Sequence, residues 1–461
     1  PEKDFVGTAK GVTVQATATI TNANGETTTI TSDASYTPTV VAAVPTASPA
    51  TSKDVQGATQ TGTPTFAGTT VQVNGEDKAI TIKDNSYTLL DNDGNEVSST
   101  PAYAADGTTE IGIFSIDPAT GQVTFTPTDK SYTGAVTPAK VQAESSNGIK
   151  VDTTYTPEIV PVTPTATPAE TTDIQGATQK GKPEFKGGTV TVDGVEKTVE
   201  INEAVPATFD DGSTTKTVEG VGTYTVAADG TVTFVPEKSF VGTAPAVTVV
   251  REDKNGTKAS ATYTPTVTPV TPTATPAETT DIQGATQTGK PEFTAGDSRV
   301  PMNDDVPATF DDGSTTKTVN GVGTYTVAAD GTVTFVPEPS FTGTAPAVTV
   351  VREDMNGTKA SATYTPTVTP ITVTPTDKVS ADIQNVPQTQ TPTFDLSNDK
   401  TAEITSKKLV DPATGQPTDE TTVIVAGEGS YTIDPTTGAV TFTPEKDFVG
   451  TAKGVTVQAT A

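Results

Sequence analysis

The stretch Gly222-Thr-Tyr-Thr-Val-Ala-Ala-Asp-Gly-Thr-Val-Thr-Phe-Val-Pro236 decides the fold class of this chain. Apolar residues alternate in it with threonine, so Tyr224 and Val226 share one face of an extended strand, and Val232 and Phe234 share a face of the next. An Asp-Gly pair interrupts the alternation with the residues of a tight turn. The stretch therefore predicts a β-hairpin with one apolar face.

A second hairpin is predicted immediately downstream, in residues 247–263. Asn255-Gly256 lies at its centre, and we expect both residues to take the positive φ of a type I′ turn. The same dipeptide recurs at Asn24-Gly25, Asn147-Gly148 and Asn356-Gly357. Short strands about ten residues apart, without helical periodicity, predict an all-β fold of immunoglobulin-like or cadherin-like β-sandwiches with about seven strands each.

Comparison of the chain with itself shows that these hairpins belong to a recurring unit. The phrase Asp-Val-Gln-Gly-Ala-Thr-Gln begins at Asp54, returns at Asp173 and Asp281 with Ile in place of Val, and recurs in degraded form at Asp382. A period of about 100 residues is the size of one domain. We therefore predict a tandem array that contains the C-terminal part of a repeat (1–40), repeat 1 (41–160), repeat 2 (161–268), repeat 3 (269–369) and repeat 4 (370–461), which lacks its closing strands.

The repeats differ in their joints and in one hairpin. Short Thr/Pro-rich linkers such as 264–276 are predicted to be extended, semi-rigid spacers, because proline fixes φ and removes a donor. An alternating stretch between Phe185 and Pro206 of repeat 2 is shortened in repeat 3, so we place that hairpin at a sheet edge or domain end. Repeat 1 is instead expected to be extended there, through Tyr87 to Tyr103.

Composition excludes much of the usual catalytic chemistry. The 461 residues contain no His and no Cys, which removes Ser-His-Asp and Cys-His catalysis, disulfides and the commonest zinc ligands. With 28 Lys and Arg against 56 Asp and Glu, the net charge is −28, and such a chain repels nucleic acid. No apolar run approaches the length of a membrane helix, so we expect no membrane insertion. We expect a protein that is not an enzyme and has no cofactor.

The ordered motifs of each repeat resemble a known family. Asp-Ile-Gln-Gly, Pro-x-Phe, Gly-Thr-Tyr-Thr-Val, Gly-Thr-Val-Thr-Phe-x-Pro, Phe-x-Gly-Thr-Ala and Tyr-Thr-Pro follow one another as in the CshA-type fibril repeat of streptococcal-type, cell-wall-anchored surface adhesins. The resemblance covers essentially the whole chain. It implies an extracellular stalk on the surface of a Gram-positive bacterium, with the adhesive region and the wall anchor outside this sequence. The degraded motif at Asp382 and the variant at Tyr132 depart from the pattern.

Three acidic turns are candidate metal sites. Asp91-Asn-Asp-Gly-Asn-Glu96 offers alternating oxygen ligands, but its spacing does not fit an EF-hand loop and no other repeat contains it. Phe209-Asp-Asp-Gly-Ser213 and Phe310-Asp-Asp-Gly-Ser314 recur, yet two acids before glycine are ordinary residues of a hairpin tip. We therefore predict solvated turns and assign no catalytic, cofactor-binding or metal-binding residue, with calcium as the alternative.

A Lys–Asn cross-link inside a repeat would need a buried asparagine. Asn255 and Asn356 occupy an asparagine position that repeats 2 and 3 share, and the predicted hairpin turn places them in solvent. Lys–Asn cross-links are therefore not expected, whereas a Lys–Asp link stays open.

These observations favour a stalk that projects a separate adhesive region for attachment to host cells or other bacteria. Its expected partners are neighbouring repeats of the same chain, lateral fibril contacts and, through regions outside this chain, host matrix proteins or other bacteria. Three alternatives remain: repeats that bind such partners themselves through avidity, a disordered surface stalk, and assembly in which one chain completes the last repeat of another.

Overall fold

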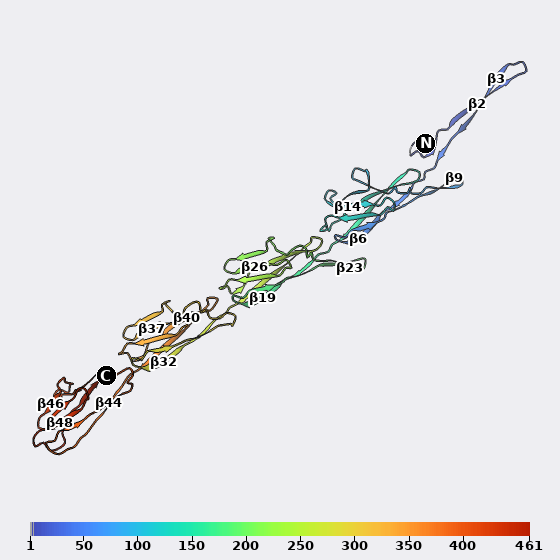
Figure 1. Ribbon diagram of the computed structural model, residues 1–461. Helices are drawn as coiled ribbons and strands as arrows, with labels where there is room; N and C mark the ends of the chain where they lie inside the picture. Colours follow the sequence, from blue (N-terminus) through green and yellow to red (C-terminus); the bar gives the residue numbers. More distant parts are fainter. Residues whose placement is uncertain (1, 3) are drawn as a thin grey trace. The chain divides into compact units, whose positions relative to one another are not determined.

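The computed structural model describes residue 2 and residues 4–461. Strands account for all the regular structure of these residues, which contain no helix, so the all-β prediction is confirmed (Figure 1). Positions 1 and 3, part of the predicted partial repeat at 1–40, lie outside the described residues. The chain forms two compact units, one of Pro1–Thr172, Thr178–Val235 and Thr243–Thr266, the other of Asp173–Ala177, Pro236–Gly242 and Val267–Ala461.

Repeat 1 is a sandwich of two sheets, ordered β12-β11-β16-β17-β6 and β13-β14-β15-β7. Its strands are β5 (Thr46–Ser48), β6 (Ala50–Val55), β7 (Gln60–Gly62), β8 (Thr65–Ala67), β9 (Thr70–Val73), β10 (Glu76–Ala79), β11 (Thr88–Leu90), β12 (Glu96–Val97), β13 (Ser99–Tyr103), β14 (Glu110–Ile116), β15 (Val123–Pro127), β16 (Ala139–Glu144) and β17 (Lys150–Val160). Antiparallel hairpins join β9 to β10, β13 to β14, β14 to β15 and β16 to β17. In contrast, β6 pairs in parallel with β17, with Ala50 opposite Tyr155. The first long strand of the repeat, β6, thus lies at one edge of the five-stranded sheet, beside the last strand, β17.

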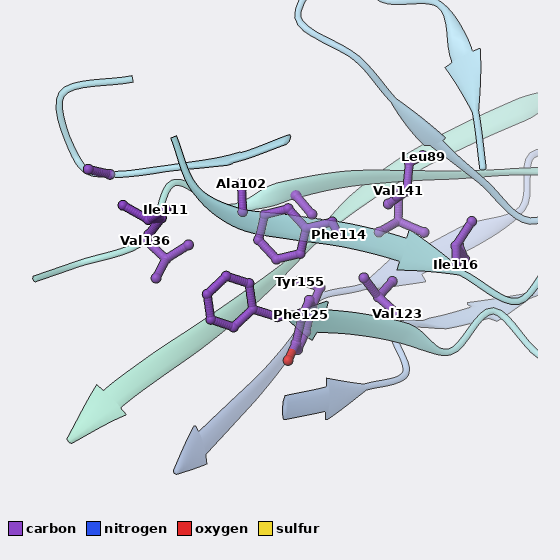
Figure 2. Packing of buried hydrophobic residues seen from close by; sticks show 12 residues of the cluster. Leu89, Ala102, Ile111, Phe114, Ile116, Val123, Phe125, Val136, Val141 and Tyr155 are labelled. Atoms are coloured by element: carbon purple, nitrogen blue, oxygen red, sulfur yellow. The ribbon is translucent and has the colours of Figure 1, made fainter. Parts of the chain in front are cut away.

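The core of repeat 1 lies between these two sheets. Phe114 of β14 packs on Phe125 of β15 with ring centroids 5.4 Å apart, and it meets the Tyr155 ring edge-on at 6.1 Å (Figure 2). All three side chains are buried because alternate residues of each strand point inward. Offset and edge-to-face aromatic pairs of this kind stabilise a small core beyond their buried area.

Repeat 2 contains the hairpin that decides the fold class. Its strands are β18 (Thr165–Thr167), β19 (Ala169–Ile174), β20 (Gln179–Gly181), β21 (Glu184–Lys186), β22 (Gly188–Val192), β23 (Val195–Val199), β24 (Thr208–Phe209), β25 (Thr215–Val218), β26 (Gly222–Val226), β27 (Val232–Pro236), β28 (Gly242–Thr243), β29 (Val247–Glu252) and β30 (Lys258–Thr268). Tyr224 of β26 and Phe234 of β27 are fully buried with ring centroids 4.6 Å apart, and Val226 and Val232 are buried beside them. The predicted inward face is confirmed.

Repeat 3 has the same sandwich, with β39 beside β41 and sheet orders β32-β41-β40-β35 and β33-β38-β37-β36. Its strands are β31 (Thr273–Thr275), β32 (Ala277–Ile282), β33 (Gln287–Gly289), β34 (Glu292–Thr294), β35 (Thr309–Phe310), β36 (Thr316–Val319), β37 (Gly323–Val327), β38 (Val333–Pro337), β39 (Gly343–Thr344), β40 (Val348–Glu353) and β41 (Lys359–Thr369). Tyr325, Phe335 and Tyr364 are fully buried in its core. The parallel closure recurs between β32 and β41.

Repeat 4 has a smaller core of Leu409, Val423, Tyr431, Ile433 and Val440. Its strands are β42 (Val373–Thr376), β43 (Gln388–Gln390), β44 (Thr393–Leu396), β45 (Ser406–Leu409), β46 (Thr422–Val425), β47 (Gly429–Ile433), β48 (Val440–Pro444) and β49 (Val457–Thr460). The order β43-β48-β47-β46 reproduces one sheet of the other repeats, whereas β45 and β49 form a separate pair.

The N-terminal segment forms an isolated hairpin. Its strands are β1 (Gly7–Thr8), β2 (Val12–Thr21), β3 (Thr27–Tyr36) and β4 (Thr39–Val40). Every residue of β2 and β3 is exposed. Tyr36, which precedes Thr-Pro as Tyr155 does in repeat 1, is 66% exposed, whereas Tyr155 is 0% exposed. The apolar residues of β2 and β3 therefore alternate as in the other hairpins but are not covered by a second sheet.

The predicted type I′ turn at Asn255-Gly256 is wrong in its geometry. Gly256 has a φ of +83°, but Asn255 is not among the residues with positive φ. The amide of Gly256 donates to the carbonyl of Asp253, and that of Asp253 to the carbonyl of Thr257, each at 2.9 Å. The loop is thus one residue longer than a type I′ hairpin and needs a left-handed residue only at glycine. Two-residue turns with positive φ at both positions occur at Asn74-Gly75 and Asp193-Gly194.

One expectation about the variable segments is confirmed and one needs correction. Repeat 1 keeps the hairpin as β9 and β10 and is extended beyond it, where β11 and β12 are added. The 264–276 joint is mostly strand, since only residues 269–272 and Pro276 lie outside β30 and β31. Extended Thr-rich backbone suits a strand as well as a spacer, and the sequence alone does not show which neighbour it pairs with.

Candidate functional site

The acidic turn of repeat 1 uses its carboxylate within the turn. Asp91 accepts hydrogen bonds from the amides of Asp93 and Asn95 at 2.9 and 2.7 Å, and from the Asn95 side chain at 3.0 Å. The side-chain and backbone bonds from Asn95 lower the pKa of Asp91 below its ordinary value. Both oxygens of the strongest candidate ligand therefore already have donors.

The recurring Asp-Asp-Gly turns are paired with lysine. Lys216 contacts Asp210 and lies 3.3 Å from Asp211 Oδ2, while its ammonium sits 5.5 Å from the centre of the Phe209 ring. Hydrogen bonds from Ser213 lower the pKa of Asp211 to about 2. Lys317, Asp311, Asp312 and Phe310 repeat this arrangement in repeat 3. A cation over an aromatic face beside two carboxylates stabilises a hairpin tip.

The described residues contain neither a metal-binding cluster nor a membrane-spanning helix. No group of three or more acidic side chains that could hold a metal ion occurs among the residues that the structure describes. Within residue 2 and 4–461, no helix has the length and apolarity needed to cross a bilayer.

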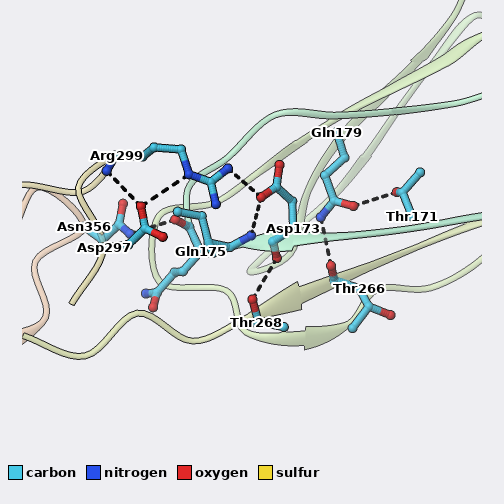
Figure 3. Close-up of polar contacts among 10 residues, drawn as sticks. Thr171, Asp173, Gln175, Gln179, Thr266, Thr268, Asp297, Arg299 and Asn356 are labelled. Atoms are coloured by element: carbon cyan, nitrogen blue, oxygen red, sulfur yellow. Dashed lines mark hydrogen bonds and ion pairs between the residues drawn. The ribbon is translucent and has the colours of Figure 1, made fainter.

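The structure gathers polar side chains at the junctions between repeats instead. At junction 1, between repeats 1 and 2, Lys197 of β23 lies 2.7 Å from Asp54 of β6. At junction 2, between repeats 2 and 3, Arg299 lies 2.8 Å from Asp173 (Figure 3). The two residues of each pair belong to the same compact unit. The acid that opens the Asp-x-Gln-Gly phrase therefore has a basic partner from the following repeat at both places.

The shortened hairpin belongs to this region. In repeat 2, Val192 and Val199 of β22 and β23 form an apolar cluster with Val55 and Val162. Repeat 3 has one isolated bridge, between Asp297 and Val300, in place of the hairpin. The prediction that this hairpin lies at a domain end is confirmed, and Arg299 of the shorter loop takes the role of Lys197.

The glutamine of the Asp-x-Gln-Gly phrase organises each junction. Gln56 is 1% exposed, and its Nε2 donates to the carbonyls of Lys130 and Ser131 at 3.2 and 3.0 Å. Its Oε1 accepts from the amide of Val162, at the start of repeat 2, at 3.2 Å. Gln175 makes the corresponding bonds: it donates to the Lys238 carbonyl and accepts from the Val270 amide. Gln283 likewise donates to the Pro339 carbonyl and accepts from the Ile371 amide. One side chain thus connects a repeat to the chain that leaves it.

The expectation that Asn255 and Asn356 are exposed is wrong. Both are half-buried, because each reaches the preceding repeat. Asn255 Nδ2 donates to the carbonyl of Gln56 at 2.8 Å, and Asn356 Nδ2 donates to that of Gln175 at 2.9 Å. Sequence reasoning used the Gln-Gly and Asn-Gly dipeptides as repeat markers and turn signals, and missed their contact. Their recurrence at a constant place in successive repeats was the available signal.

Comparison with known families gives the repeats an identity. Residues 42–159, 161–267, 269–368 and 370–461 each match the model of the surface adhesin CshA repetitive domain. The chain belongs to this family. Four CshA repeats follow one another across it, which confirms the resemblance drawn from the ordered motifs. A family of surface adhesins indicates an extracellular, adhesion-related repeat region of structural rather than enzymatic character.

Comparison with individual proteins gives no further assignment. No curated protein matches the chain. Among solved structures, mouse cadherin-23 EC22-24 is similar over 71% of this chain and 100% of its own, with 14% identity and a TM-score of 0.30. The I9–I11 tandem of titin covers 71% of this chain and 100% of its own, with 10% identity and a TM-score of 0.28. The sandwich prediction is confirmed by the two-sheet orders of repeats 1 and 3.

Proposed function

We propose that these CshA repeats form the structural stalk of a bacterial cell-surface fibril, which projects a separate adhesive region for attachment to host cells or other bacteria. The observation that carries the proposal is the uninterrupted succession of four surface-adhesin repeats. A chain in which each domain contacts only its neighbours resists load through the stability of each domain and of each junction. Anchoring to a cell wall belongs to the same proposal and involves a segment outside this sequence.

The internal use of the polar groups supports a mechanical role. Asp91, Asp211 and Asp312 accept bonds within their own turns, and Asp54 and Asp173 pair with the following repeat. A net charge of −28 keeps neighbouring fibrils soluble and mutually repelled.

Small-angle X-ray scattering of the 461-residue chain, in chelator and in millimolar calcium, tests the stalk. We expect the same profile in both buffers, that of an elongated particle with the cross-section of one small domain. A random-coil profile in both buffers would replace the folded stalk with a disordered one. A profile that becomes elongated only with calcium would show that the acidic turns bind the ion.

Binding measurements test the alternative in which the repeats themselves attach to partners. Surface-immobilised 461-residue chain should retain neither host matrix proteins nor whole bacteria above the level of an unrelated acidic protein. Retention that increases with the number of repeats per surface area would show adhesion through avidity and contradict a purely structural role.

A further inference from the structure

The contact between the Gln-Gly loop of one repeat and the Asn-Gly turn of the next recurs at two junctions. At junction 1, Asn255 Nδ2 donates to the Gln56 carbonyl at 2.8 Å, and Gln56 Nε2 donates to Thr257 Oγ1 at 3.0 Å. At junction 2, Asn356 Nδ2 donates to the Gln175 carbonyl at 2.9 Å. We call these pairs, Gln56 with Asn255 and Gln175 with Asn356, the Gln–Asn contacts.

Both partners are held in place before they meet. The buried Gln56 side chain bonds its own repeat and the departing chain, which positions its carbonyl. In the facing turn, the fully buried Asp253 accepts from the amides of Asn255 and Thr257, each at 2.9 Å, and Asp354 does the same in repeat 3. A donor and an acceptor that are already oriented lose little conformational entropy when they bind.

The glycine after glutamine leaves room for the asparagine. A Cβ on Gly57 would lie 2.2 Å from Asn255 Oδ1, and one on Gly176 would lie 2.4 Å from Asn356 Oδ1. Backbone conformation is a separate requirement, because the same loop position in repeat 4 is Asn385 with a φ of +63°, close to the +80° of Gly57. At Gly284, which has a φ of +82°, a Cβ would meet only Thr401 at 3.5 Å, an ordinary contact.

The ion pairs at the junctions are weaker candidates for specificity. Lys197 and Asp54 expose 37% and 21% of their side chains, and Arg299 and Asp173 expose 55% and 32%. Exposed pairs contribute little, and their basic member differs between the junctions in residue type and in the loop that carries it. The Gln–Asn contact keeps the same residues and atoms at both junctions.

We propose that the Asn-Gly turns of repeats 2 and 3 are the docking elements by which these two repeats bind the Gln-Gly loop of the repeat before them, so that the Gln–Asn contact holds adjacent repeats in one orientation. The partner of this surface is the next copy of the repeat in the same chain. The inference extends the proposed stalk by naming the residues that stiffen it.

Distance distributions between spin labels on repeats 1 and 2 test the docking in the full chain. Because the protein contains no Cys, Lys140→Cys and Glu219→Cys introduce labels only at these two exposed positions. We expect one narrow distribution in this background. Asn255→Asp, which keeps the shape but replaces the donor with an acceptor, and Gly57→Ala should both broaden it. Gly284→Ala, with the same φ requirement and no facing asparagine, measures the backbone strain alone, as the change in hydrogen exchange around Gln283.

Hydrogen exchange distinguishes loss of docking from loss of fold. In Asn255→Asp, the amides around Gln56 should open about fivefold more often, the factor expected from one lost hydrogen bond, while β14 and β26 keep their protection. A distribution that is broad before any substitution, or equally narrow in Asn255→Asp and Gly57→Ala, would overturn the proposal. Either result is compatible with the proposed stalk if scattering still shows an elongated particle. Failure of the docking proposal can therefore be distinguished from failure of the stalk proposal.

Discussion

At the residue scale, a buried polar trio recurs in the cores. In repeat 2, Thr171 Oγ1 lies 2.7 Å from the Tyr263 hydroxyl and donates to Gln179 Oε1 at 2.6 Å, while Gln179 Nε2 donates to the Thr266 carbonyl at 2.9 Å. Repeats 1 and 3 have the same trio, with Ser52 or Thr279 at the centre. One hydroxyl thus satisfies two buried polar groups, which would otherwise lower the stability of the fold.

Thr171→Val should destabilise repeat 2 by about 1–3 kcal/mol, because it leaves Tyr263 and Gln179 without their partner. Thr171→Ser is the matched control, since repeat 1 has Ser52 at this position, and it should stay within about 1 kcal/mol. Denaturant unfolding monitored by hydrogen exchange in β26 and β27 measures both. Equal losses in the two variants would show that the hydroxyl, which only Thr171→Ser keeps, does not account for the stability.

Alkaline pH should unfold the chain through its buried tyrosines. Burial raises the pKa of Tyr224 and Tyr325 to about 12, with a smaller effect from the neighbouring tyrosine of each. The neutral hydroxyl is therefore favoured in the fold, so this stabilisation holds below about pH 10 and is lost as the pH rises toward 12. Ultraviolet titration, undisturbed by Trp, should show the buried group ionising together with loss of the β-sheet circular dichroism. Ionisation of all ten tyrosines with intact dichroism would contradict this.

At the element scale, the β22–β23 hairpin belongs to a junction more than to a core. Repeat 3 keeps its aromatic core without this hairpin, whereas in repeat 2 the hairpin supplies Val192, Val199 and Lys197 to the boundary with repeat 1. A hairpin that packs on a neighbouring repeat can vary in length without disturbing either sandwich.

Replacing residues 189–200 with Asp-Ser-Arg-Val-Pro, the loop of repeat 3, should leave repeat 2 folded. The transplanted arginine should pair with Asp54 as Arg299 pairs with Asp173, and Val55 should lose part of its cover. Hydrogen exchange should increase around Val55 and remain unchanged in β26 and β27. Loss of protection in β26 would show that the hairpin is needed by the core of its own repeat.

At the scale of the whole molecule, stability is distributed among separate cores. Repeats 1 and 3 have clusters rich in aromatic residues, whereas the cluster of repeat 4 is smaller. No hydrogen bond from repeat 4 to the carbonyl of Gln283 is found among the described residues, in contrast to Gln56 and Gln175. In tandem arrays the stability of each domain adds to that of its junctions.

Calorimetry of the 461-residue chain should therefore show more than one transition. Repeat 4 should unfold first, with repeats 1 to 3 following at higher temperature, because it combines the smallest core with a junction that lacks the Gln–Asn contact. Hydrogen exchange measured near the temperature of the first transition identifies the repeat that unfolds in it. We expect early loss of protection in β47 and β48. A single sharp transition of the entire chain would mean that the junctions couple all repeats.

The sequence by itself determined the repeat, the β class and the inward faces. Alternation of Tyr224, Val226, Val232 and Phe234 is a local property, since side chains along a strand point alternately to its two faces, and a threonine on the outer face needs no partner. Recurrence of the ordered motifs likewise identified the family before any coordinates. The physical cause of such a pattern lies within the segment that shows it.

Only the tertiary structure decided how the repeats meet. The parallel pairing of Ala50 with Tyr155 joins residues far apart along the chain, and no periodicity indicates such a partner. The contact of Asn255 with Gln56 depended on the placement of one repeat against another. Hydrogen bonds between distant segments depend on three-dimensional proximity, which local propensity does not encode.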